Sequence, residues 1–212
     1  MLNGNTTLVA LTIGGNDGGA FANATTTCTK SVFGDCGSTS FMDKYRGKID
    51  EAQANTSRVL TTIAAKAPNA QIVLMGYPDI FRTDGLACGS HDIEAGNAKP
   101  LSDLAAYMAQ KQQATLDSLA KKPGPGLKIA SADPGTVFNN HGVCGNTPWF
   151  HGVSLNPNGD GDFHKGDKPT QFCIPLTEWC ISRESFHPTG DGATGYTQVL
   201  QNKLTAIGYR GS

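Results

Sequence analysis

Apolar residues follow two kinds of pattern along the chain, one typical of buried strands and one typical of helices. Residues 7–13 (TLVALTI) form an apolar, β-branched run that stops at two glycines, and residues 71–76 (QIVLMG) form a second. Such runs predict strands buried on both faces of a parallel sheet. Residues 127–130 predict a third, shorter strand.

Between and after these strands, apolar positions recur every three or four residues, which predicts amphipathic helices. The first helix is expected over residues 43–66, before Pro68, the second over 101–119, and the last over 196–207. The apolar face expected for the first helix consists of Ile49, Ala52, Val59, Leu60 and Ile63. Alternating strands and helices predict an α/β fold, a three-layer, flavodoxin-like parallel sheet, in one domain spanning residues 1–212.

Two stretches lack any period and are expected to be loops: the segment that follows the first strand, and residues 137–183, which are rich in Gly, Asn and Asp. The first strand raises a different question. A domain that begins with its most apolar strand exposes that strand at a sheet edge, which is an aggregation hazard. We therefore expect further strands, from before residue 1, to lie beside it.

Composition narrows the function classes. Seventeen basic and eighteen acidic residues give a net charge of -1, so the field that draws proteins to nucleic acid or anionic membranes is absent. The longest apolar run is too short to span a bilayer, and the first residues do not form a signal peptide. We expect a protein with no nucleic-acid partner and no transmembrane segment.

Six cysteines suggest disulfides and an oxidising, extracellular environment. The pairing we favour joins Cys28 to Cys36, Cys88 to Cys144, and Cys173 to Cys180. The tight ligand pairs of a structural zinc site are missing. Reduced, buried thiols in a cytosolic protein remain the alternative.

The first candidate chemistry is Gly14-Gly15-Asn16-Asp17, directly after the first strand. Open α/β sheets bind ligands at the carboxyl ends of their strands. Two glycines allow close approach to the backbone, and the Asn16 amide is suited to hold an oxyanion during acyl transfer. The same tetrapeptide is also ordinary turn chemistry, so a purely structural turn is the alternative.

The second candidate is Glu184-Ser185-Phe186-His187-Pro188, just before the last helix. A carboxylate three residues before a histidine is placed to accept its Nδ1–H and leave Nε2 free as a general base. The other four histidines are scattered through polar loops, where solvated or loop-bracing histidine is the usual case.

With these two motifs, the sequence resembles the SGNH or GDSL hydrolases, in particular their secreted actinobacterial lipase and esterase branch. Residues 7–17 (TLVALTIGGND) look like the third block of that family, and residues 184–189 (ESFHPT) look like its last block. Residues 140–144 (NHGVC), followed by Pro148-Trp149, resemble the stretch before the histidine block. The resemblance covers nearly the whole chain.

The resemblance implies a secreted carboxylic ester hydrolase that uses a serine acyl-enzyme, needs no cofactor and acts on a small-molecule or lipid ester. It makes Asn16 an oxyanion donor, supported by Gly14, Gly15 and Asp17, and it makes His187 the base. Glu184 would orient His187, although some members use a backbone carbonyl there. Cys88 and Cys144 match a disulfide position of the branch, whereas Cys173 and Cys180 look like an addition.

The family's Gly-Asp-Ser block, which carries the nucleophile, occurs nowhere in these residues. Ser90 and Ser131 are weak replacements, because neither lies on an evident strand-to-helix turn. We therefore expect that a separate N-terminal segment supplies the serine, and that this chain alone has little or no esterase activity.

A third feature is the loop beginning Asn156-Pro157-Asn158-Gly159-Asp160-Gly161. The oxygen side chains of Asn156, Asn158, Asp160 and Asp167, with a glycine at the sixth position, follow the spacing of an EF-hand loop. Asn leads in place of Asp, and Asp167 is shorter than the usual Glu. A Ca²⁺ site and a solvated loop tip are the two interpretations.

Two other functions remain as alternatives. A nonenzymatic secreted binding module, or a decayed hydrolase, would use Trp149, Phe150 and Trp179 of the long loop to bind a glycan or protein. A metal-dependent phosphoesterase is less favoured, because no clustered histidine and aspartate ligand motif is present.

Overall fold

Three short strands form a parallel sheet in the order β1-β2-β3 in the computed structural model of the chain. They are β1 (Leu8–Leu11), β2 (Gln71–Met75) and β3 (Ile129–Ala132), with Leu8 beside Gln71 and Ile72 beside Ile129. Parallel neighbours need long crossovers, and here helices supply them. The structure describes residues 2–30, 35–81, 95–121, 127–143, 145–157, 179–182 and 184–211.

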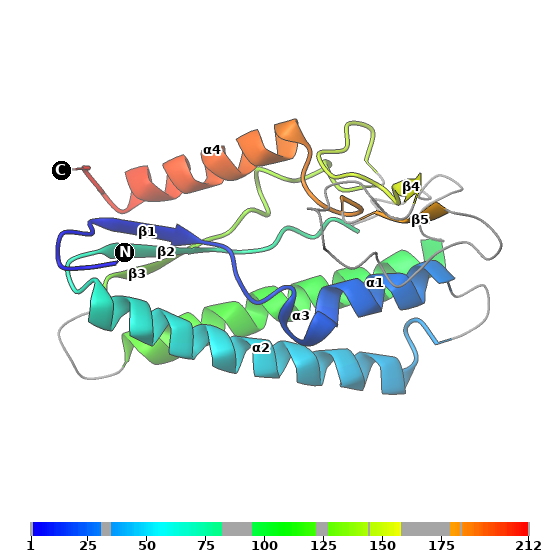
Figure 1. Cartoon of the computed structure of the whole chain (residues 1–212), viewed down its shortest axis with the longest axis horizontal. Helices are drawn as coiled ribbons and strands as arrows, with labels where there is room; N and C mark the ends of the chain where they lie inside the picture. The colour runs from blue at the N-terminus through cyan, green and yellow to red at the C-terminus, as the bar shows by residue number, and fades with distance from the viewer. Residues whose placement is uncertain are drawn as a thin grey trace.

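Helices cover the sheet on both faces, which makes the three layers expected from the sequence. The crossover helices α2 (Thr39–Lys66) and α3 (Ala95–Ala120) pack side by side on one face (Figure 1). The last helix, α4 (Gly190–Ala206), lies across the other face against β2 and β3 (Figure 1). The predicted α/β class is therefore confirmed. Among the described residues, no helix combines the length and hydrophobicity needed to cross a bilayer.

The core is densest around β2 rather than β1. Ile72, Val73 and Leu74 of β2 are almost fully buried because strands flank β2 on both sides. By contrast β1 is only half-buried and Ala10 is exposed. In the described part of the chain β1 is one of the two edge strands of the sheet. The expectation that it is buried on both faces is therefore wrong there.

Helix α2 begins four residues earlier than predicted because Ser38 caps it, its hydroxyl accepting a hydrogen bond of 3.2 Å from the Phe41 amide. Its buried face includes Leu60 and Ile63, as expected. Val59, which was assigned to that face, is 42% exposed instead. Val59 directly precedes Leu60, so a rotation of about 100° separates their directions and only Leu60 faces the sheet.

Two predicted loops contain secondary structure. The loop after β1 contains a short 3-10 turn, η1 (Asp17–Gly19), and helix α1 (Ala20–Lys30). Within the stretch expected to be irregular, β4 (Leu155–Pro157) and β5 (Trp179–Ile181) pair in antiparallel orientation. These elements lie beyond the carboxyl ends of the parallel strands (Figure 1). The third strand also begins two residues later than predicted.

Candidate active site

The loop that follows β1 is shaped by two glycines. Gly14 has a φ of 98°, which side-chain-bearing residues rarely adopt, and a Cβ there would lie 3.1 Å from Thr56 Oγ1. A Cβ on Gly15 would lie 2.7 Å from Cζ of Tyr77, so a larger residue there would have to displace the end of the Tyr77 side chain. The Asp17 amide donates to the Gly14 carbonyl at 3.3 Å and closes the turn. The backbone conformation thus favours glycine at position 14, and the contact with Tyr77 favours it at position 15, while the supporting role of both in a site stays a prediction.

Asn16 stands at the tip of this loop, immediately before η1. Its side chain does not cap that turn, although a residue at this position commonly does. Asn16 is exposed and lines a cavity. Its carboxamide is thus not used to cap the turn that follows.

Asp17 and the glycine after it tie the loop to α2. Asn55 Nδ2 donates to the Asp17 carboxylate at 3.3 Å. Lys48 Nζ donates to the Gly18 carbonyl at 2.6 Å. Asp17 is therefore a supporting residue of the loop.

His187 is held by backbone pairing with a distant segment. The His151 amide donates to the His187 carbonyl at 2.9 Å, and the Phe186 amide donates to the His151 carbonyl at 3.0 Å. Nδ1 of His187 lies 3.2 Å from the Ser185 carbonyl oxygen. A carbonyl only accepts, so this contact favours the tautomer with a proton on Nδ1 and leaves Nε2 as the free base.

The contact between His187 Nδ1 and the Ser185 carbonyl bears on the orienting role predicted for Glu184. The Ser185 carbonyl provides to Nδ1 the acceptor that the sequence pattern assigned to the Glu184 carboxylate. The alternative that the resemblance offered, orientation by a backbone carbonyl, is the arrangement seen here. The orienting role of Glu184 stays a prediction.

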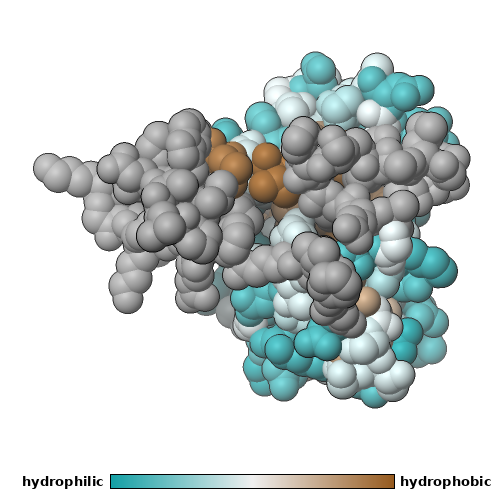
Figure 2. Space-filling view, turned by 90° about the vertical axis from the view of Figure 1, so that its right-hand side faces the viewer, coloured by the Kyte–Doolittle hydropathy of each residue, from teal (hydrophilic) through white to brown (hydrophobic). Residues whose placement is uncertain are grey.

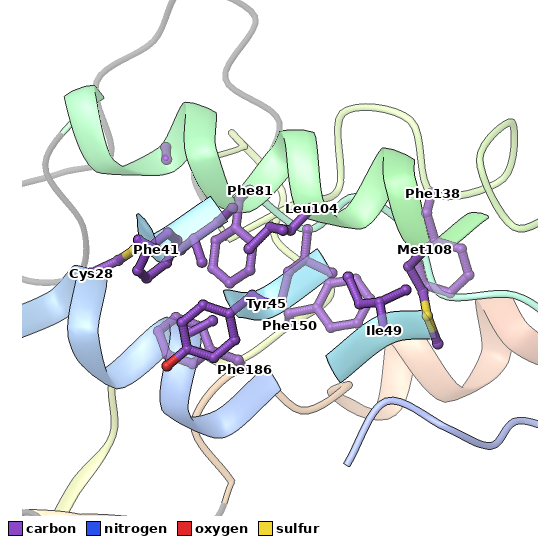
Figure 3. Packing of buried hydrophobic residues seen from close by; sticks show 14 of the residues in the cluster. Cys28, Phe41, Tyr45, Ile49, Phe81, Leu104, Met108, Phe138, Phe150 and Phe186 are labelled. Atoms are coloured by element: carbon purple, nitrogen blue, oxygen red, sulfur yellow. The ribbon is translucent and has the colours of Figure 1, made fainter. Parts of the chain in front are cut away.

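Asn16 and His187 come from opposite ends of the chain and line the same cavity of about 360 Å³. The remaining walls are largely apolar and come from α1, α2, α3, α4, the loop after β2, and the segments that carry Phe150 and Phe186. Figure 3 shows several of these apolar side chains packed together beneath α3, and Figure 2 shows hydrophobic residues at the end of the molecule beyond the strands. The apolar lining includes Phe21, Ile49, Phe81, Leu104, Met108, Phe150 and Phe186.

No serine or cysteine is found among the described residues that line this cavity. Ser131 lies within β3, paired with Leu74, and does not contribute to the lining. Ser90 falls outside the described residues. The described part of the cavity thus brings a histidine and an asparagine together against largely apolar walls.

Two tyrosines that are not among the site residues predicted from the sequence also line the cavity, Tyr77 after β2 and Tyr196 on α4. The Gly15 amide donates to the Tyr77 hydroxyl at 3.0 Å. Burial raises the pKa of Tyr77, and the nearby Asp17 charge raises it further, against the opposing effect of the Gly15 hydrogen bond. Burial likewise raises the pKa of Tyr196. The one available signal for Tyr77 was its place just after the Gly76 that ends the second predicted strand.

The Cys28–Cys36 disulfide is present, as predicted, and it joins α1 to the segment before α2. Cys88, Cys144 and Cys173 and the side chain of Cys180 lie outside the described part of the structure. The same holds for Asn158, Asp160 and Asp167 of the calcium-like loop. Asn156 lies in β4, where its backbone pairs with Cys180. The other two disulfides and the Ca²⁺ site stay predictions.

In a comparison with known proteins, no family model matches the chain. It is 29% identical over 203 residues to a lipase of Streptomyces rimosus, covering 95% of this chain and 62% of the relative, and 28% identical over 206 residues to lipase 1 of Streptomyces coelicolor, covering 94% and 61%. The chain thus spans about three fifths of the length of these curated relatives.

Among solved structures, the crystal structure of an extracellular lipase from Streptomyces rimosus superposes with a TM-score of 0.67 and 27% identity. The match covers 95% of this chain and 70% of that one. The chain is therefore similar, over nearly its whole length, to Streptomyces lipases in both sequence and fold.

Proposed function

We propose that this chain carries the base and oxyanion half of a carboxylic ester hydrolase of the SGNH type. The observation that carries the proposal is the meeting of Asn16 and His187 in one largely apolar cavity. The similarity to lipases supports the reaction class. It also supports secretion, because one similar structure is of an extracellular lipase.

The proposed reaction proceeds through an acyl-enzyme. Nε2 of His187 takes the hydroxyl proton of a serine as the serine oxygen attacks the ester carbonyl. The Asn16 carboxamide donates to the developing oxyanion, and His187 then gives its proton to the departing alkoxide. Water, activated by His187 in the same way, releases the acid and restores the serine. The Ser185 carbonyl holds the imidazole throughout.

The nucleophile is proposed to come from a segment outside these 212 residues. No Gly-Asp-Ser occurs in the sequence, and the outer edge of β1 has no paired strand among the described residues. A parallel strand that pairs with this edge would end beside the carboxyl end of β1, close to the loop that carries Asn16. The relatives' additional length is sufficient for such a segment.

The substrate is proposed to be an ester with an apolar acyl group. The walls of the cavity are mainly aromatic and aliphatic, including Phe21, Phe81 and Met108. Burying such a chain removes apolar surface from water, which favours binding. A charged acyl group would lose its hydration against these walls without gaining a partner.

The test compares two proteins: the 212-residue chain, and the chain extended by the upstream coding region that contains a Gly-Asp-Ser segment. We expect the extended protein to hydrolyse a chromogenic short-chain ester, and we expect His187→Ala to abolish that activity. The shorter chain should show little or no turnover. Robust turnover by the shorter chain, lost on His187→Ala, would disprove the external nucleophile. An extended protein that folds but is inactive on esters would disprove the hydrolase proposal.

A further inference from the structure

Tyr77 connects the second strand of the sheet to the loop that carries Asn16. It lies two residues after β2, and its hydroxyl accepts the hydrogen bond of 3.0 Å from the Gly15 amide, the residue directly before Asn16. Among the described residues, this hydrogen bond satisfies the Gly15 N–H. The contact joins two loops that are distant in sequence and adjacent at the carboxyl ends of neighbouring strands.

The Tyr77 ring also fixes the position of the loop sterically. A Cβ placed on Gly15 would lie 2.7 to 2.9 Å from two ring carbons and the hydroxyl oxygen of Tyr77. The end of the Tyr77 side chain therefore occupies the space beside Gly15, which limits movement of the loop toward Tyr77. The opposite movement would break the hydrogen bond to the hydroxyl.

We propose that Tyr77 is a positioning residue, which holds the Gly14–Asn16 loop so that the Asn16 carboxamide meets the oxyanion. This inference rests on the proposed ester hydrolysis. A side chain that acts only when charge develops in the transition state must already be in place, because reorganisation during the reaction costs rate. Asn16 makes no capping hydrogen bond of its own, so its position depends on the neighbours of its backbone.

The chemical state of Tyr77 suits this role. Its burial raises the pKa of the phenol, so the hydroxyl stays neutral through the pH range in which esterases are assayed. A neutral hydroxyl accepts from the Gly15 amide and keeps one proton to donate.

The kinetic test uses Tyr77→Phe in the ester-hydrolysing form of the protein, which removes the hydroxyl and keeps the ring. We expect kcat to fall about tenfold while KM changes little, because the loss concerns the transition state more than substrate binding. The matched control is Tyr107→Phe. Tyr107 donates to Asp50 at 3.1 Å on the surface between α2 and α3, and its loss should leave kcat unchanged.

A double-mutant cycle separates positioning from a direct role. If Tyr77 acts through Asn16, Tyr77→Phe should have no further effect on kcat once Asn16 is already alanine. An equal fall in kcat in both backgrounds would overturn the proposal, because Tyr77 would then act without Asn16. An unchanged kcat in the single Tyr77→Phe variant would overturn it as well.

A second measurement does not require activity. In the 212-residue chain, Tyr77→Phe should speed hydrogen exchange at the Gly15 amide and shift the Asn16 side-chain NMR signals, while the amide of Val73 in β2 stays unchanged. Unchanged Gly15 and Asn16 signals would contradict the positioning role. If these signals change but no form of the protein hydrolyses esters, the proposed function fails while the structural coupling of Tyr77 to Asn16 stands.

Discussion

The backbone next to His187 helps to set the orientation of its imidazole. The preceding residue, Phe186, has a φ of 63°, a left-handed conformation that is uncommon for a bulky residue. Such a conformation costs roughly 1 kcal/mol or more and persists where packing enforces it. Here the Phe186 ring packs against Phe81, with centroids 5.4 Å apart, and against Phe21 at 6.4 Å. Phe186 thus contributes to the aromatic wall of the cavity and fixes the backbone directly before His187.

Asn16→Ala tests the oxyanion role at the scale of one residue. In the ester-hydrolysing form we expect kcat to fall by about 10²–10³, the usual effect of removing one oxyanion donor. The free energy of unfolding should stay the same, because Asn16 is exposed and does not cap η1. Asn202→Ala, at an exposed position of α4, is the matched control. A variant with full kcat would remove Asn16 from the mechanism.

Side chains with distinctive chemistry could be recognised from the sequence, whereas backbone groups could not. The sequence predicts Asn16 from its place at the carboxyl end of a strand, and His187 from the carboxylate three residues before it, and both residues fall in the blocks that carry the family resemblance. The Ser185 carbonyl that holds His187 carries no sequence signal, since every residue has a carbonyl. Tyr77 was missed for a related reason, because its partner is the backbone amide of Gly15.

At the scale of elements, α2 presents two neighbouring apolar residues with opposite environments. Leu60 is fully buried against the sheet, and Val59 is 42% exposed. We expect Leu60→Ala to lower the free energy of unfolding by about 2–5 kcal/mol through lost burial and the cavity left behind. Val59→Ala should change it by less than about 0.5 kcal/mol. Urea unfolding of both variants measures the difference, and equal effects would contradict the packing of α2.

The contact between α2 and α3 includes an ion pair whose contribution to stability depends on pH. Lys111 Nζ lies 2.8 Å from Asp50 Oδ1. The hydrogen bond from Lys111, opposed in part by burial, is the main cause that lowers the pKa of Asp50 below 3.8, and the bond to Asp50 is the main cause that raises the pKa of Lys111 above 10.5. The side chains of Lys111 and Asp50 are 37% and 47% exposed, so solvent screens the pair and its contribution is small.

Asp50→Asn tests this pair. A lowered carboxyl pKa stabilises the fold above pH 3.8, and that stability is lost as the pH falls through the lowered pKa. A raised lysine pKa stabilises below pH 10.5 and is lost as the pH rises through the raised pKa. The variant should therefore be slightly less stable than the parent between about pH 5 and 9, and the difference should vanish in strong acid. A difference in melting temperature that persists at about pH 2 would contradict the assignment.

Long periodic helices were predictable, and α1 was not. The sequence of α1, AFANATTTCTK, contains four threonines, which have low helix propensity and weaken any periodic signal. Tertiary contacts stabilise it instead: Ala24 and Cys28 are buried, and the disulfide to Cys36 fixes its end. Local pattern cannot reveal a helix whose stability comes from contacts with α2 and α3.

At the scale of the whole molecule, the outer edge of β1 has no paired strand among the described residues, and the proposed serine-bearing segment would pair there. The Gln71 amide donates to the Thr7 carbonyl at 2.9 Å. In a parallel ladder alternate residues bond to the same neighbour, so the backbone groups of Val9 and Leu11 face β2. Those of Leu8 and Ala10 therefore face the open edge, where the proposed strand would pair.

Ala10→Pro tests whether this edge is used. Proline removes the outward N–H of Ala10 and leaves the inward bonds of Val9 and Leu11 intact, so the β1-β2 pairing should survive. In the 212-residue chain we expect the fold, followed by circular dichroism, to be retained. In the extended protein the same change should block strand addition and abolish ester hydrolysis. Ala10→Thr, which keeps the N–H and suits a strand, should remain active. An extended Ala10→Pro protein with full activity would place the serine-bearing segment elsewhere and would leave the edge of β1 without a role in the site.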